Sequence, residues 1–252
     1  MKKAIAIILL IVFGAGLYFN FVHTGSVSND TTTEDQESAK TENNEDNQNN
    51  ESAEDSEAST DETETSEQPD SIAFNESSIQ EQYDQRIANN EALIVDVLTP
   101  AYYNSDFADR LNQQFDTNTI QFNQVEMPGN TVDMNELTVN DNSDIVIMDA
   151  MQIADYNDEV LPERNLNNLR NAYMDLYNAD KTVIILGNAN VHEHENLADT
   201  LSNDAEYFPN NDFFYIDNQE VSVENPYNPD DNVMNPAVED EIINNIQAYL
   251  LQ

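Results

Sequence analysis

The feature that most constrains this chain is the apolar segment Ala92–Tyr103, ALIVDVLTPAYY, which is broken by Pro100. A short apolar run bounded by turn-forming residues is typical of a buried strand, and we predict one over Leu93–Val97. In open α/β sheets, ligands and reactive groups lie at the carboxyl ends of the strands. Val97 stands where such a group is expected, and its side chain can neither attack, ionise nor donate a hydrogen bond. We therefore expect a first strand without a nucleophile at that position.

Apolar runs recur downstream of this segment, and they alternate with segments of helical spacing. We expect strands at Leu93–Val97, Ile120–Val125, Asp144–Met148, Lys181–Leu186 and Asp212–Ile216, and helices at Ser78–Asn90, Asn104–Phe115, Val132–Leu137, Asn165–Tyr177, Asn196–Leu201 and Val238–Leu250. Alternation of this kind gives right-handed crossovers and a parallel sheet with helices on both faces. Residues 76–252 are therefore predicted to form a three-layer α/β/α domain with five parallel strands.

The first 23 residues predict attachment to a membrane. Lys2 and Lys3 precede Ala4–Val22, an almost wholly apolar segment. As a helix it would span about 28 Å, close to the thickness of the bilayer core. The lysines favour a cytoplasmic N-terminus, so that the rest of the chain faces outward on a single-pass signal-anchor. The alternative is a signal peptide cleaved near Gly14–Gly16, which would give a secreted protein.

Residues 24–75 predict a disordered acidic linker. Between Thr24 and Asn75 there are 16 acidic residues and one basic residue, with almost no large apolar side chains. Such a segment cannot bury enough apolar area to offset its chain entropy, and its like charges extend it. We interpret it as a solvated stalk, with the capture of cations or basic partners as the alternative.

The charge of the whole chain excludes one class of partner. With 50 acidic and 8 basic residues, the net charge is −42, which repels the phosphates of nucleic acid. The same charge disfavours tight docking on an anionic lipid surface. The absence of Cys excludes disulfides and thiolate metal sites. No cofactor and no metal are expected.

Four short segments follow the predicted elements in a fixed order: Val95–Thr99, Pro128–Thr131, Asp149–Asp155 and Asp231–Asn235. Their order, with the flanking strands and helices, resembles the SGNH (GDSL-type) hydrolase family over about residues 85 to 252. Members of that family are flavodoxin-like α/β/α enzymes that cleave esters of lipids and carbohydrates, or acetylate and deacetylate glycans. The resemblance implies that fold, with a crevice at the carboxyl ends of the strands.

The catalytic positions that the resemblance implies have lost their functional groups. Val97 stands for the family's Ser, Ala154 for its oxyanion Asn and Met234 for its His, whereas Gly129 and Asp231 match. Nucleophilic hydrolysis needs a hydroxyl, a base and donors for the oxyanion. Because all three side-chain functions are missing, the resemblance implies a domain that has kept the shape and lost the reaction.

Three other residues can supply a relocated active site. Thr99 lies two positions beyond Val97 and points the same way in an extended segment. His192 and His194 follow the predicted strand Lys181–Leu186, in a loop at the carboxyl edge. The alternative for both histidines is exposure in a loop before the next helix. Their spacing without a third fixed ligand does not indicate a metal site.

Tyr102, Tyr103 and Asp155 are the residues expected to contact a ligand. The two tyrosines are placed to stack on sugar rings near the crevice, with packing in the core as the alternative. Asp155 follows Ala154 and opens the acidic segment Asp155–Glu159. In so acidic a chain, such a cluster is a weak indication of a Ca²⁺ site.

The sequence favours a cell-surface binding or accessory module that holds a cell-envelope glycan or a partner protein without hydrolysing it. The alternative is a divergent SGNH esterase or acetyl-hydrolase. It would act on cell-envelope carbohydrate or lipid esters through Thr99 or the loop of His192 and His194.

Overall fold

The computed structural model describes residues 72–252, apart from 128, 192–193 and 229–231. The predicted membrane segment and nearly all of the predicted linker lie outside the described residues. Within residues 72–252, the helices described are all too short or too polar to span a membrane.

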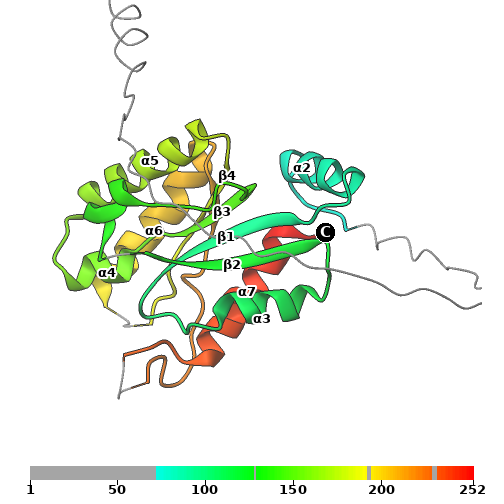
Figure 1. Cartoon of the computed structure of the whole chain (residues 1–252). Helices are drawn as coiled ribbons and strands as arrows, with labels where there is room; N and C mark the ends of the chain where they lie inside the picture. The colour runs from blue at the N-terminus through cyan, green and yellow to red at the C-terminus, as the bar shows by residue number, and fades with distance from the viewer. Residues whose placement is uncertain (1–71, 128, 192–193, 229–231) are drawn as a thin grey trace, which may run out of the picture. The chain divides into compact units, whose positions relative to one another are not determined.

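Strands and helices alternate along the described chain, as predicted (Figure 1). The elements are α2 Ser77–Ala88, β1 Leu93–Pro100, α3 Phe107–Phe115, β2 Ile120–Met127, the 3₁₀ helix η1 Thr131–Glu136, β3 Ile145–Asp149, α4 Gln152–Asn157, α5 Pro162–Asn178, β4 Thr182–Leu186, α6 Glu195–Asn210, β5 Phe214–Ile216 and α7 Pro236–Leu250.

The strands form one five-stranded sheet in the order β2-β1-β3-β4-β5, and every neighbouring pair is parallel. The predicted sheet is confirmed. The chain passes from β1 outward to β2 and then returns to place β3 on the other side of β1. The carboxyl ends of β1 and β3 therefore flank the point where the strand order reverses, which is where open α/β sheets bind ligands.

Helices cover both faces of the sheet (Figure 1). Successive strand residues point to opposite faces, so β1 contributes to two separate cores. Val95 and Val97 pack in the cluster that includes α3 and α7, whereas Leu98 packs with residues of α5 and α6. The three-layer architecture follows from this division.

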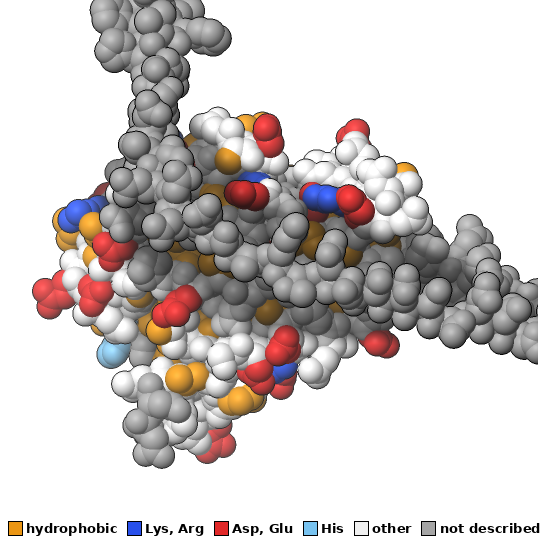
Figure 2. Space-filling model, viewed as in Figure 1, with side chains coloured by type: hydrophobic (Ala, Val, Ile, Leu, Met, Phe, Trp, Pro, Cys, Tyr) orange, Lys and Arg blue, Asp and Glu red, His pale blue; other side chains and the backbone are white. Residues whose placement is uncertain are grey.

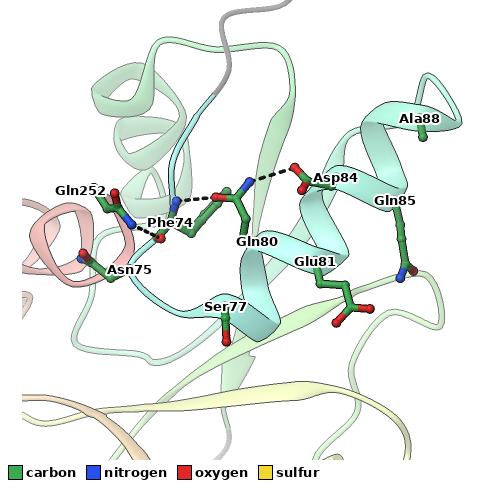
Figure 3. Close-up of a pocket in the computed structure, with 9 residues that line it drawn as sticks. All are labelled: Phe74, Asn75, Ser77, Gln80, Glu81, Asp84, Gln85, Ala88 and Gln252. Atoms are coloured by element: carbon green, nitrogen blue, oxygen red, sulfur yellow. Dashed lines mark hydrogen bonds between the residues drawn. The ribbon is translucent and has the colours of Figure 1, made fainter.

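The fold begins upstream of the predicted boundary at residue 76. Phe74 is 3% exposed and forms an antiparallel bridge with Leu251. Figure 3 shows its backbone held from two sides: its N–H donates to Gln80 Oε1 of α2 (2.8 Å), and its carbonyl accepts from Gln252 Nε2 (2.9 Å). The residues just before α2 are thus joined to the C-terminus.

β1 is longer than predicted, and this corrects the position assigned to Val97. The strand continues to Pro100, and Val97 pairs with Gln124 of β2 and Ile147 of β3. Val97 is fully buried in the middle of the strand. It is a core residue and does not stand at the strand's end.

The short helix α4 was not predicted. It begins after Met151, whose backbone takes a left-handed conformation with φ 53°. A non-glycine residue rarely adopts this conformation, so the sequence gives no turn signal there. The 3₁₀ helix η1 takes the place of the helix predicted at Val132–Leu137.

Candidate functional site

The carboxyl edge of the sheet brings Thr99 of β1 and Asp149 of β3 next to each other. Leu98 pairs with Met148, and Thr99 and Asp149 are the next residues of the two strands. Both side chains are buried, with 1% and 0% exposure. A hydroxyl and a carboxyl group therefore lie at the switch point of the sheet.

Asp149 is the centre of a hydrogen-bond network at this edge. Its Oδ1 accepts from the Tyr102 hydroxyl (3.1 Å) and the Met151 backbone N–H (2.7 Å). Its Oδ2 accepts from the Tyr103 hydroxyl (2.9 Å) and Asn188 Nδ2 (2.7 Å). Burial raises the pKa of Asp149 to about 6, although these hydrogen bonds oppose the rise. Both carboxylate oxygens are thus engaged by the protein itself.

The network continues from Asn188 into α4 and α6. The Asn188 backbone N–H donates to Gln152 Oε1 (2.8 Å), and Gln152 Nε2 donates to Asp204 Oδ2 (2.7 Å). Asn188 Oδ1 accepts from the Ile153 N–H (3.0 Å), which satisfies an amide in the first turn of α4. Burial also raises the pKa of Asp204 to about 6. Side chains from β3, α4, α6 and the segment after β4 fill the edge between β3 and β4.

Thr99 remains the hydroxyl nearest to the expected nucleophile position. Its Oγ1 accepts a hydrogen bond from Gln124 Nε2 at 2.9 Å. The same amide donates to the Asn104 carbonyl (3.1 Å). An amide N–H cannot take a proton from a hydroxyl, so Gln124 cannot act as a general base. Thr99 also lines a cavity of about 360 Å³ at the ends of β1 and β2.

Met234 lies beside the segment that follows β1. Its backbone N–H donates to the Tyr102 carbonyl (2.7 Å), and its own carbonyl accepts from Asn104 Nδ2 (2.8 Å). The side chain is buried in the core shared with α3 and α7. Its neighbour in the sequence block, Asp231, lies outside the described residues.

Of the two further positions implied by the resemblance, Gly129 follows β2 and Ala154 lies in α4. Gly129 has φ 56°, and a Cβ there would meet Asp133 Oδ2 at 2.2 Å. The left-handed backbone conformation therefore favours glycine at this position. Ala154 lies inside α4, next to the buried Asp155.

The roles predicted for the ligand-contacting residues change in the structure. Tyr103 is 4% exposed and packs edge-on against Phe107, so its ring cannot stack on a sugar. Tyr102 is partly buried and stacks on Tyr103 instead, with ring centroids 5.4 Å apart. Asp155 is buried and accepts from the Thr131 hydroxyl (2.6 Å), which ties α4 to η1.

The structure describes only one of the two predicted histidines. His192 lies outside the described residues. His194 is exposed just before α6, and its ring stacks on Tyr156 of α4 with centroids 5.4 Å apart. Across residues 72–252, leaving out the undescribed positions, no three His, Asp or Glu side chains are grouped so that they could hold a metal ion.

The sequence alone does not indicate that Asp149, Asn188 and Gln152 belong to one site. The signal that could have found the first two is their position directly after the apolar runs of β3 and β4. Parallel strands bring such residues to a common edge. This signal does not identify Gln152, because the position of Gln152 depends on the turn at Met151, which the sequence did not predict.

A further hollow lies over α2, at the opposite end of the sheet (Figure 3). Arg86 of α2 binds Asp144, just before β3, and Gln82 binds Thr182 at the start of β4 (2.9 Å). These contacts place α2 at the amino ends of the strands. The fold gives no reason to expect chemistry there.

No family model and no curated protein matches the chain. Among solved structures, it is similar to TesA, with a TM-score of 0.50 and 9% identity over 62% of this chain and 97% of TesA. A G-D-S-L family protein from Desulfitobacterium hafniense (TM-score 0.49, 11% identity, 62% of this chain and 99% of that one) and a GDSL-like lipase from Bacteroides thetaiotaomicron (0.44, 12%, 66% and 95%) are also similar. Identity this low bears on the fold alone. The chain has the five-stranded α/β fold of the SGNH, or GDSL-type, hydrolases.

Proposed function

We propose that this chain is a non-hydrolytic SGNH-type domain that binds a cell-envelope glycan or a partner protein. The observation that carries the proposal is the closed network around Asp149. A catalytic acid or base must be free to exchange a proton with substrate. Both oxygens of Asp149 are instead occupied by donors from the protein, at 2.7 to 3.1 Å.

The surroundings of Thr99 support the same proposal. Its hydrogen-bond partner among the described residues is the Gln124 amide, whose N–H donates to it and cannot accept its proton. Met234 contributes a buried thioether to the segment after β1, and a thioether is neither a base nor a strong donor. Among the described residues, the hydrogen bonds of Thr99 include none to a base that could activate its hydroxyl.

Display at the cell surface is part of the proposal and depends on residues 1–71. The apolar segment Ala4–Val22 after Lys2 and Lys3 supports a single-pass anchor, with an acidic stalk between the membrane and the domain. The partner then lies outside the cytoplasm.

A divergent esterase is the second candidate function. The observation in its favour is the cavity of about 360 Å³ that Thr99 lines with Ser105 and Gln124. That volume lies within the range of small-ligand sites. A short acyl ester is the class of substrate that would fit beside Thr99.

An assay of ester hydrolysis distinguishes the two candidate functions. Full-length protein should release p-nitrophenol from p-nitrophenyl acetate and butyrate no faster than buffer does. Thr99→Ala should change neither this rate nor, by more than a few degrees, the melting temperature. Turnover by the native protein that is lost in folded Thr99→Ala would establish the esterase and overturn the proposal.

A further inference from the structure

A second cavity, of about 710 Å³, lies between α4, the start of α5 and α6. We name it the α4–α6 cavity. Its volume falls in the range typical of small-molecule sites, about 300–1,000 Å³. Among the described residues it shares no lining residue with the cavity beside Thr99. The α4–α6 cavity is therefore a separate candidate site for binding.

Asn165 at the floor of this cavity has an unmet hydrogen-bond acceptor. The residue is 1% exposed, and its Nδ2 donates to Asp155 Oδ2 (2.8 Å) and to the Ala150 carbonyl (3.3 Å). Its Oδ1 is buried without a partner. Exchanging the amide O and N would set a carbonyl against the Asp155 carboxylate, so the orientation is fixed by Asp155.

A buried acceptor left unmet costs on the order of 1–3 kcal/mol, so its presence calls for a reason. A bound molecule with an O–H or N–H group would supply the missing donor. Asn165 is one of the residues that line the cavity. Its Oδ1 itself has almost no exposed surface, so a donor reaches it when the lining around it shifts.

The charges around the cavity restrict the class of ligand. Glu159 and Asp199 line it, and both are exposed carboxylates. No Lys or Arg is among its described lining residues. Figure 2 shows acidic side chains spread over the visible face of the molecule, with few basic ones. An anionic ligand would be repelled, whereas a neutral or cationic one would not.

The remaining lining supplies hydrogen-bonding groups beside an aromatic ring. Asn196, Thr200 and Asn203 of α6 present amide and hydroxyl groups, while Tyr156 and Pro162 present apolar surface. His194 stacks on Tyr156 and holds its ring in place. Many polar groups around one apolar face are complementary to a sugar, which carries hydroxyls at its edge and C–H groups on its faces.

We propose that the α4–α6 cavity binds a glycan unit that is neutral or carries an amino group, with Asn165 Oδ1 accepting a hydrogen bond from it. The inference rests on the proposed binding function and gives that function a site. The site lies beside α4, and Gln152, which lines it, also belongs to the network around Asp149.

The test is saturation-transfer NMR on the full-length chain with four probes: methyl β-glucoside, glucosamine, glucuronate and the peptide tetralysine. The first two should receive saturation and glucuronate should not. Asn203→Trp places a large side chain at the exposed wall of the cavity and should weaken binding at least tenfold. Ser202→Trp is the matched control, since Ser202 is its exposed neighbour on α6 and lies outside the lining.

A second pair of variants tests the charge argument. Asp199→Lys should weaken glucosamine binding more than glucoside binding, whereas Glu206→Lys on the same helix makes the same charge change outside the lining and should leave both unchanged. Circular dichroism checks that each variant is folded.

Three outcomes overturn the inference: no saturation of either sugar, saturation that Asn203→Trp leaves intact, or binding of tetralysine with no binding of the sugars. The last would assign the cavity to a cationic peptide. Ester turnover that depends on Thr99 would instead overturn the proposed function. That assay uses a Thr99 variant and the binding assay uses Asn203 and Asp199 variants, so failure of the proposed function and failure of this inference are distinguishable.

Discussion

The Tyr215 side chain of β5 occupies the space above Gly187, where β4 ends. A Cβ at Gly187 would lie 2.2 Å from the Tyr215 hydroxyl oxygen and 2.6 Å from the ring carbon that bears it. The Gly187 N–H also donates to the Ile216 carbonyl (2.9 Å), which fixes the two strand ends together. Glycine is required here by the close approach of a neighbouring strand.

Gly187→Ala should therefore destabilise the protein by about 1–3 kcal/mol, the usual cost of overpacking a core. Urea unfolding measures the loss. Because the clash is with Tyr215, the double variant Gly187→Ala, Tyr215→Leu should lose less than the sum of the two single variants. Strict additivity would show that the contact is not the cause.

The buried Asp149 should make stability depend on pH in the sense opposite to ordinary acid denaturation. Burial raises its pKa from 3.8 to about 6, so the folded state binds this proton more tightly than the unfolded chain. The free energy of unfolding should fall as pH rises from about 4 to about 6, by roughly 3 kcal/mol for this group.

Urea unfolding at several pH values checks this, with Asp149→Asn as the test variant. In this variant the free energy of unfolding should fall less between about pH 4 and 6. Part of the fall should remain, because the pKa of Asp204 is also raised to about 6. The exposed Glu81→Gln is the control and should follow the native curve. Identical curves for native protein and Asp149→Asn would contradict the assignment.

The sheet could be predicted because its strands are apolar runs that stand out from a polar chain. The end of β1 could not, because Pro100 is a strand breaker and yet belongs to the strand. Asp96 is buried with its carboxylate accepting from Asn140 N–H (2.7 Å), a residue 44 positions away. Such a partner cannot be found from local spacing.

The site was less predictable than the fold for a similar reason. Two adjacent tyrosines, Tyr102 and Tyr103, are typical of a site that stacks on sugars. The sequence does not show that both hydroxyls donate to Asp149, which lies 47 and 46 residues later. The unmet acceptor of Asn165 is visible only once Asp155 and Ala150 are placed around it.

Arg86 should stabilise the amino edge of the sheet through its fork geometry. Its Nε donates to both oxygens of Asp144 (3.0 Å each), and Nη2 donates to Oδ1 at 2.7 Å. Arg86→Lys keeps the charge and loses the fork, so we expect a loss of about 1–2 kcal/mol in urea unfolding. Arg170→Lys, exposed on α5, is the control and should lose less than about 0.5 kcal/mol. Equal losses in the two variants would show that the fork contributes nothing.

Salt should stabilise the full-length protein. Residues 76–252 carry 34 acidic and 5 basic residues, and this repulsion is screened within about 8–10 Å at ordinary ionic strength. The melting temperature should rise from low salt to about 1 M NaCl at pH 7. The rise should shrink near pH 4, where many carboxylates are protonated. A flat response at pH 7 would mean that the charges are already balanced by the fold.

Val97→Ser should not restore a reaction, because Val97 is fully buried in the middle of β1 and its replacement would bury a hydroxyl in the core of α3 and α7. We expect a loss of about 2–4 kcal/mol and no ester hydrolysis. Thr99 is the residue at the strand's end, and Met234 contacts the segment that follows it.

The combination Thr99→Ser, Met234→His should therefore give turnover of p-nitrophenyl acetate above background. Groups that act as a unit are strongly non-additive, so each single variant should stay at background. Melting curves separate a failed site from a failed fold. Activity in Val97→Ser alone would contradict this argument, because it would require the middle of β1 to open and bring residue 97 to the carboxyl edge.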